Sequence, residues 1–193
     1  MRFIETSLAG AFVLDLDVHA DARGFFARSF CQREFEAHGL DPVVAQGGIA
    51  FNHHRGTIRG MHFQYPPAAE AKVVRCTRGA MLDVIIDLRP ESATYLRHVS
   101  IELTADNHRS LYVPARFAHG YQTLADATEA TYQMSEFHAP ELADGLACDD
   151  AALEIAWPLA ASEISARDRM WTPLGDRAST LRERMARTVL TGR

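Results

Sequence analysis

The sequence predicts a mainly β protein, an antiparallel sandwich or barrel with a few short flanking helices. The first observation is a period-2 alternation of apolar and polar residues in the middle of the chain. It covers five strand-length segments, at 80–89, 97–104, 109–114, 120–126 and 129–137. The second is the presence of turn-forming residues between several of them, as in "RPES", "ADN" and "DAT". Many short strands at close spacing are typical of an antiparallel sandwich or barrel, not of alternating strand–helix units.

Two earlier segments, "GTIRGMHFQ" and "AKVVRC", are also expected to be strands, and the bend "YPPAAEA" separates them. Residues two apart in a strand share a face. Gly60, His62 and Gln64 should therefore point one way, and Arg59, Met61 and Phe63 the other. By the same rule Lys72, Val74 and Cys76 share a face, as do Asp83, Ile85 and Asp87, and Ala130, Tyr132, Met134 and Glu136.

Two helices complete the expected elements. The segment "CQREFEAHGL" has helix formers and a stop at Gly39. Near the C-terminus, "RASTLRERMARTVL" has apolar residues at Leu181, Met185 and Leu190, and predicts an amphipathic helix over about 176–190 that packs on the barrel or on a partner chain. No repeat or long linker divides the chain, so residues 1–193 are expected to form one domain.

Composition excludes several classes of function. A net charge of -5 and a pI near 6.0 argue against a general nucleic-acid binder, which would show a basic surplus. The three cysteines have no metal-binding spacing and indicate reduced thiols in a cytosolic protein. The chain shows no signal peptide and no apolar run of about eighteen residues. We therefore expect a soluble, cytoplasmic protein that binds neither nucleic acid nor membrane.

Polar residues among the apolar strands point to a cavity. His62, Lys72, Asp83 and Tyr132 can converge inside a small barrel, although the sequence leaves the strand register open. A histidine is a usable general base at neutral pH, a lysine stabilises a developing oxyanion, and a tyrosine hydroxyl donates a proton. Such a set suits proton abstraction next to a carbonyl group.

A metal site is the alternative. The chain has nine histidines, including the adjacent pair His53–His54, and "PARFAHGYQ" is expected to place His119 at a turn after a strand. Adjacent strand residues face opposite ways, and the common metal-ligand spacings are missing from the sequence. The pair is better interpreted as exposed loop histidines.

Seven motifs occur in a characteristic order: "DARGFF", "GTIRGMHFQYPP", "AKVVRCTRGAMLDVIIDLRPESATY", "LTADNHRSLYVPARFAHGYQTL", "ATYQMSEFHAP", "DDAALEIAWP" and "EISARD". Over roughly residues 10–170 the chain resembles the dTDP-4-dehydrorhamnose 3,5-epimerase family. The resemblance implies a cupin-type β-jelly roll, a homodimer without metal or organic cofactor, and a nucleotide-linked 4-keto-6-deoxyhexose as substrate. It also implies proton abstraction at C3 and C5, an enolate intermediate, and reprotonation from the opposite face.

Carried over to this sequence, the resemblance implies a role for each matching residue. His62 is the base, Asp168 its carboxylate partner, Tyr132 the acid, and Lys72 the cation beside the enolate oxygen. The implied substrate contacts are Arg23, Phe26, Arg59, His119 and, where the family has a base-stacking tyrosine, His138. From the residues alone, Asp83 stays open as a partner for Lys72 or His62.

The chain departs from the family pattern at Arg28, Gly47–Ile49, Arg116, His138 and Ala147–Cys148. These departures leave the nucleotide, and inversion at C3, C5 or both, undecided. Three alternatives stay open: an epimerase that acts at C3 alone, a cupin that binds nucleotide sugars without catalysis, and a metal-dependent cupin.

Overall fold

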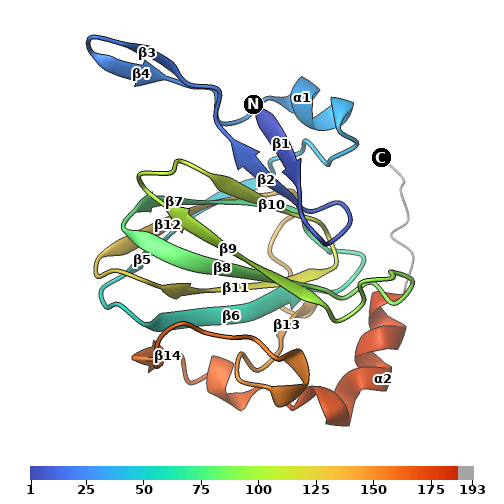
Figure 1. The fold of residues 1–193 in the computed structure, drawn as a ribbon. Helices are drawn as coiled ribbons and strands as arrows, with labels where there is room; N and C mark the ends of the chain where they lie inside the picture. Colours follow the sequence, from blue (N-terminus) through green and yellow to red (C-terminus); the bar gives the residue numbers. More distant parts are fainter. Residues whose placement is uncertain (187–193) are drawn as a thin grey trace.

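The computed structural model describes residues 1–186, and its body consists of two β-sheets packed face to face (Figure 1). The first sheet has the order β1 (Arg2–Glu5), β2 (Phe12–Asp15), β10 (Ser110–Val113), β7 (Lys72–Arg78), β12 (Thr128–Met134) and β5 (Gln46–Asn52). The second has the order β13 (Ala143–Gly145), β6 (Thr57–Gln64), β11 (Phe117–Thr123), β8 (Ala80–Asp87) and β9 (His98–Thr104), with β14 (Glu163–Ile164) parallel to β6. All the other pairings in these two sheets are antiparallel. The predicted mainly β jelly roll is confirmed.

Four of the five strands predicted in the middle of the chain correspond to β8, β9, β10 and β12, with small differences at the ends. The strand predicted over 120–126 corresponds to β11 (Phe117–Thr123), which begins and ends three residues earlier than predicted. Arg116 adopts a positive φ of 67° and makes the turn before the strand. Gly120 lies within the strand, so His119 is a strand residue and not a turn residue.

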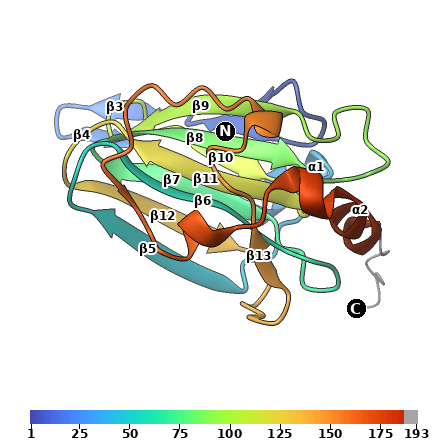
Figure 2. The same ribbon diagram turned by 90° about the horizontal axis from the view of Figure 1, so that it is seen from below.

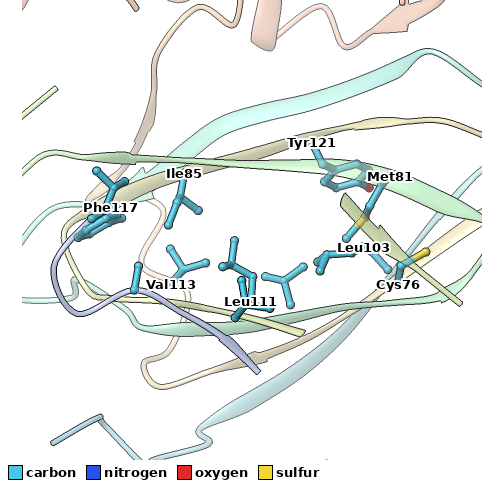
Figure 3. Close-up of a cluster of buried hydrophobic side chains, with 13 residues drawn as sticks. Cys76, Met81, Ile85, Leu103, Leu111, Val113, Phe117 and Tyr121 are labelled. Atoms are coloured by element: carbon cyan, nitrogen blue, oxygen red, sulfur yellow. The ribbon is translucent and has the colours of Figure 1, made fainter. Parts of the chain in front are cut away.

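The space between the sheets is filled by apolar side chains from both (Figure 3). Cys76, Leu111 and Val113 come from the first sheet, and Met81 and Ile85 come from the second. All five are at most 1% exposed. This packing holds the two inner faces together and leaves polar side chains to line a cavity beside it.

The outer faces are covered by the predicted helices and by the C-terminal segment (Figures 1 and 2). Phe35 of α1 (Gln32–Ala37) packs on the first sheet, and Gly39, at a φ of 69°, follows the helix end as predicted. The second sheet is covered by the segment that holds η1 (Ala151–Leu153), η2 (Asp168–Met170) and α2 (Leu174–Met185). Of the helix predicted over 176–190, residues 187–190 lie outside the described residues.

A third, two-stranded sheet forms a hairpin that projects from the body (Figure 1). Its strands are β3 (His19–Asp21) and β4 (Gly24–Phe26), and all six strand residues are exposed. The hairpin carries Arg23 and Phe26 away from the space between the two large sheets.

A β-bulge in β6 changes which of its residues share a face. His62 lies opposite His119 of β11, and Arg59 lies opposite Tyr121. Two residues of β6 therefore lie between these pairs, against one residue of β11. An extra residue of this kind reverses the alternation. The prediction that Arg59 faces away from His62 was wrong, because the bulge turns both toward the inner side.

Two other expectations concern the described residues. Within residues 1–186, no helix is long and apolar enough to cross a membrane. Cys31, Cys76 and Cys148 are free thiols, as predicted.

Candidate active site

A cavity of about 280 Å³ opens between the inner faces of the two sheets. It is lined by residues of β6, β11, β7 and β12, and by Gly48, Ile49 and Ala50 of the edge strand β5. Its lining includes Arg59, His62, Lys72, His119, Tyr121 and Tyr132. Five of the predicted site residues therefore meet in one place.

His62 lies at the junction of three cavities and forms a pair with Asp168. The distance between His62 Nε2 and Asp168 Oδ1 is 2.6 Å. The His62 side chain is 45% exposed and the Asp168 side chain only 4%, so the imidazole remains accessible while its carboxylate partner is buried. This arrangement fixes the ring and stabilises the imidazolium that forms when His62 accepts a proton.

Asp168 reaches the pair from the C-terminal segment, where η2 begins. Its backbone N–H donates to Ser165 Oγ at 3.1 Å, and the Gly60 N–H lies 3.5 Å from Oδ2. Burial works to raise the pKa of Asp168, but the interactions with His62, Ser165 and Gly60 hold it below the ordinary value of 3.8. The Asp168 carboxylate is therefore ionised at neutral pH.

Tyr132 faces the cavity from the first sheet, opposite the sheet that carries His62. Its ring lies edge-on to His119, with the ring centroids 5.8 Å apart. Burial raises the pKa of Tyr132 well above its ordinary value of 10.0, and nearby Tyr121 and Asp83 act in the same direction. Its hydroxyl therefore stays protonated and available as a proton donor.

Lys72 forms an ion pair with Glu70, with 3.0 Å between Nζ and Oε1. The two side chains are 10% and 11% exposed. Lys72 also lines a second cavity of about 210 Å³, together with His62, Glu70 and His138. The ammonium group thus stands in the wall between two cavities, where it can meet an anionic oxygen.

His119 forms a second histidine–carboxylate pair. Its Nε2 is hydrogen-bonded to Oδ1 of Asp83, and both residues are buried. The sequence leaves Asp83 open as a partner for Lys72 or His62, but the structure pairs it with His119. The other carboxylate oxygen of Asp83 has no hydrogen-bond partner among the described residues.

Arginines gather on the other side of His62. Arg59, Arg167 and Arg169 line a third cavity of about 540 Å³. Arg59 is held by Asn52, with Nε donating to Oδ1 at 2.7 Å. The sequence analysis does not single out Arg167 or Arg169, although they stand directly before and directly after Asp168.

Two predicted substrate contacts lie elsewhere in this chain. Arg23, whose side chain is 90% exposed, is paired with Asp21 at 2.6 Å. Phe26, the last residue of β4, is 73% exposed. Neither of them lines the cavities around His62, whereas His138 does.

No group of three or more metal-binding side chains gathers within the part of the chain that the structure describes. His53 and His54 are exposed and follow the end of β5, in agreement with their interpretation as loop residues. The site around His62 offers acid–base groups and cations instead. It holds a histidine with its carboxylate, a tyrosine hydroxyl from the opposite sheet, and an ammonium group in the same cavity, a set that suits proton abstraction beside a carbonyl.

Comparison with known proteins gives consistent matches along the chain. The family model described as dTDP-4-dehydrorhamnose 3,5-epimerase matches residues 5–176. A curated protein of that name from Methanothermobacter thermautotrophicus is 38% identical over 176 residues, which cover 90% of this chain and 94% of the relative.

Two solved structures are similar over most of their length. A dTDP-4-dehydrorhamnose 3,5-epimerase from Bacillus anthracis, with TDP and PPi bound, superposes with a TM-score of 0.86 at 36% identity, covering 90% of this chain and 99% of that chain. A 3'-monoepimerase from Streptomyces bikiniensis, in complex with dTDP-quinovose, has a TM-score of 0.84 at 31% identity, covering 92% of this chain and 90% of that chain.

Proposed function

The chain belongs to the dTDP-4-dehydrorhamnose 3,5-epimerase family, and from this premise we propose which substrate it takes and which residues carry the reaction. It is an isomerase of deoxysugar biosynthesis. Its substrate is a nucleotide-linked 4-keto-6-deoxyhexose of the dTDP-4-dehydro-6-deoxy-D-glucose type. The reaction inverts C3, C5 or both.

The C4 ketone of such a sugar acidifies the hydrogens on C3 and C5, because the carbanion left behind is delocalised as an enolate. His62 takes the proton, and Asp168 stabilises the resulting imidazolium. Lys72 stands beside the enolate oxygen and stabilises its charge. Tyr132 then delivers a proton to the opposite face of the carbon, and the configuration inverts.

One observation carries this proposal. His62 and Tyr132 line one cavity from opposing sheets. A base and an acid on the two sides of a sugar ring are what inversion requires, since the proton leaves one face and another arrives on the other. The raised pKa of Tyr132 supports the role of acid, because the hydroxyl keeps its proton at neutral pH.

The nucleotide end of the substrate extends toward the arginines. Arg59 lies beside His62, and Arg167 and Arg169 line the adjoining cavity, so a diphosphate placed there would meet several guanidinium groups. His138 takes the place of the stacking tyrosine at the rim. A histidine ring offers a smaller stacking face, so selectivity among nucleotide bases should be weak.

The exposed hairpin supports a homodimer. Arg23 and Phe26 match family motifs that contact the substrate, yet in one chain they project away from the cavity. A second copy is the arrangement that gives them a role, because the hairpin of each chain then reaches the cavity of its partner. In this proposal the whole chain is one domain, acts in the cytoplasm and uses no metal or organic cofactor.

The test is incubation with dTDP-4-keto-6-deoxyglucose in D₂O, followed by NMR at both ring positions. Deuterium at C3 and C5 without added metal is expected, and label at C3 alone would identify a 3-epimerase. No exchange at either position would refute the proposal. Activity that is lost with a chelator and restored by a divalent ion would refute the cofactor-free mechanism.

A further inference from the structure

The segment after Asp168 brings an indole ring against the histidine–carboxylate pair. We propose that Trp171 is a positioning residue, which holds the Asp168 carboxylate in the orientation that supports His62. This inference rests on the proposed epimerase function. It adds a residue that none of the sequence motifs singled out.

The place of the ring is set by a glycine. Gly145 of β13 lies directly opposite His62 of β6 in an antiparallel pairing, so a side chain at position 145 would project beside the imidazole. That space is taken by the indole of Trp171. A Cβ added at Gly145 would lie 2.7 Å from the indole nitrogen and from Cζ2, closer than real Cβ contacts. The indole therefore packs directly on the backbone at position 145, and only glycine leaves room for it there.

The polar end of the ring reaches the carboxylate. Trp171 Nε1–H donates to Asp168 Oδ1 at 3.3 Å, and this is the oxygen that His62 contacts at 2.6 Å. The two rings lie roughly edge to face, with an interplanar angle of 70° and centroids 6.3 Å apart. Arg167 covers the indole from another side, with 5.2 Å from its guanidinium carbon to the ring centroid. The ring is thus held by packing, and its N–H is aimed at one oxygen.

A carboxylate that pairs with a catalytic base must keep one oxygen turned toward it throughout the reaction. Asp168 receives an N–H at each oxygen, from Gly60 at Oδ2 and from Trp171 at Oδ1. The longer of these contacts is 3.5 Å. Without the indole N–H, the orientation of the carboxylate would depend on that weak contact, on Ser165 and on His62 itself. Trp171 contacts the pair and lines none of the three cavities around His62, so its removal should lower turnover and leave substrate binding nearly unchanged.

The chain offers a matched control. Trp157 is the other tryptophan of the chain, is also partly buried, and donates its Nε1–H to the backbone oxygen of Cys148 at 2.8 Å. It packs on the outer face of the second sheet, and its indole N–H is bonded to the backbone and not to Asp168. Replacing either tryptophan with phenylalanine keeps an aromatic ring and removes one N–H. Only the change at 171 removes a donor to Asp168.

The experiment compares Trp171→Phe with Trp157→Phe in the D₂O exchange assay and in steady-state kinetics. We expect kcat of Trp171→Phe to fall about tenfold, which corresponds to about 1.4 kcal/mol, with KM within twofold of wild type. Trp157→Phe should retain wild-type kinetics. In an Asp168→Asn background, Trp171→Phe should have no further effect on exchange, because the residue acts through the carboxylate that is already lost.

A second measurement does not depend on turnover. In Trp157→Phe the fluorescence comes from Trp171 alone, and adding Asp168→Asn should change its emission. In Trp171→Phe the same change should leave the emission of Trp157 unaltered. The role of Trp171 would be overturned if Trp171→Phe kept the wild-type kcat or if both tryptophan variants lost the same activity. It would also be overturned if the losses of Trp171→Phe and Asp168→Asn were additive, or if the emission of Trp171 did not change. If the wild-type protein exchanged no hydrogen at C3 or C5, the proposed function would be overturned, and the role of Trp171 with it.

Discussion

Replacing Gly60 with alanine should destabilise the fold and slow hydrogen exchange. This glycine lies in the bulge that turns both Arg59 and His62 toward the cavity. Gly60 has a φ of 126°, a conformation that L-residues rarely adopt. A Cβ there would lie 2.5 Å from the Gly120 Cα and 2.9 Å from the His119 carbonyl oxygen. Both of these atoms belong to the backbone of β11, so neither can move aside without displacing the strand.

The two effects can be estimated separately. The unfavourable φ costs about 1–3 kcal/mol. The added methyl group in a closely packed position costs about another 1–3 kcal/mol. The free energy of unfolding should therefore fall by about 2–6 kcal/mol in Gly60→Ala. A displacement of about 1 Å at a reacting group costs roughly 10²-fold in rate, and we expect a loss of this size in exchange at C3.

Two other glycines serve as controls. Gly39 has a positive φ of 69° but nothing within 4 Å of an added Cβ, so Gly39→Ala isolates the backbone strain, about 1–2 kcal/mol. Gly175 in α2 also has an open Cβ position, and there alanine should change stability by less than about 1 kcal/mol, in the stabilising direction. Urea unfolding of the three variants, followed by the D₂O assay, measures both quantities.

The order of stabilities is the decisive result. If Gly60→Ala unfolds within about 1 kcal/mol of Gly39→Ala, the close approach of β6 and β11 does not cost what the geometry implies. If Gly60→Ala is strongly destabilised yet exchanges hydrogen at the wild-type rate, the bulge does not position the base.

Four further predictions concern single residues. Tyr132→Phe should still exchange hydrogen in D₂O while forming little inverted sugar, because the base remains and the acid is gone; normal epimerisation would make Tyr132 a packing residue. The folded pKa of Asp168 lies below 3.8, so its carboxylate stabilises the fold above that pH and loses this contribution as the pH falls through the folded value. Asp168→Asn should therefore flatten the acid side of a plot of unfolding free energy against pH; an unchanged slope would contradict the pairing with His62. Arg23→Ala and His62→Ala should each be weakly active alone and regain activity when mixed, because a hybrid dimer has one cavity with both native residues; no recovery would argue against a hairpin that serves the partner. His138→Ala should alter the relative rates with dTDP, UDP and CDP forms of one sugar; a strong preference for dTDP that the change leaves intact would exclude stacking at this position.

Local alternation was enough to predict the central strands, β6 to β12, but not the strands β1, β2, β5 and β13 that complete the two sheets. Val74 of β7 follows the period of two, because alternate residues of this strand are buried. In β8 both faces are covered, and residues 83–87 are all buried. The same rule failed at Arg59, because one extra residue in a bulge reverses the faces and leaves no mark on an alternating pattern. A glycine at position 60 was a signal, since bulges favour it.

Short-range sequence patterns could not predict which residues form pairs within the site. Asp168 is 106 residues from His62, and only the resemblance to a family linked the two. The pairing of His119 with Asp83 depends on the register between β11 and β8, which brings Asp83 next to the histidine's strand and which no short-range pattern specifies. Trp171 lies outside all the motifs that indicated the family, and its position three residues after Asp168 was the only signal in the sequence.

The order of these residues along the chain has a consequence for biosynthesis on the ribosome. His62, Lys72 and Tyr132, the proposed base, cation and acid, are all made before Asp168, the carboxylate that pairs with His62. At about 5–20 residues per second, Asp168 is added roughly 5–20 s after His62. A nascent chain can pair β6 with β11 during that interval, but it cannot support the imidazolium. Catalytic competence should therefore arrive as a late event of translation, and ribosome-bound chains that stop before η2 should be folded in part and inactive.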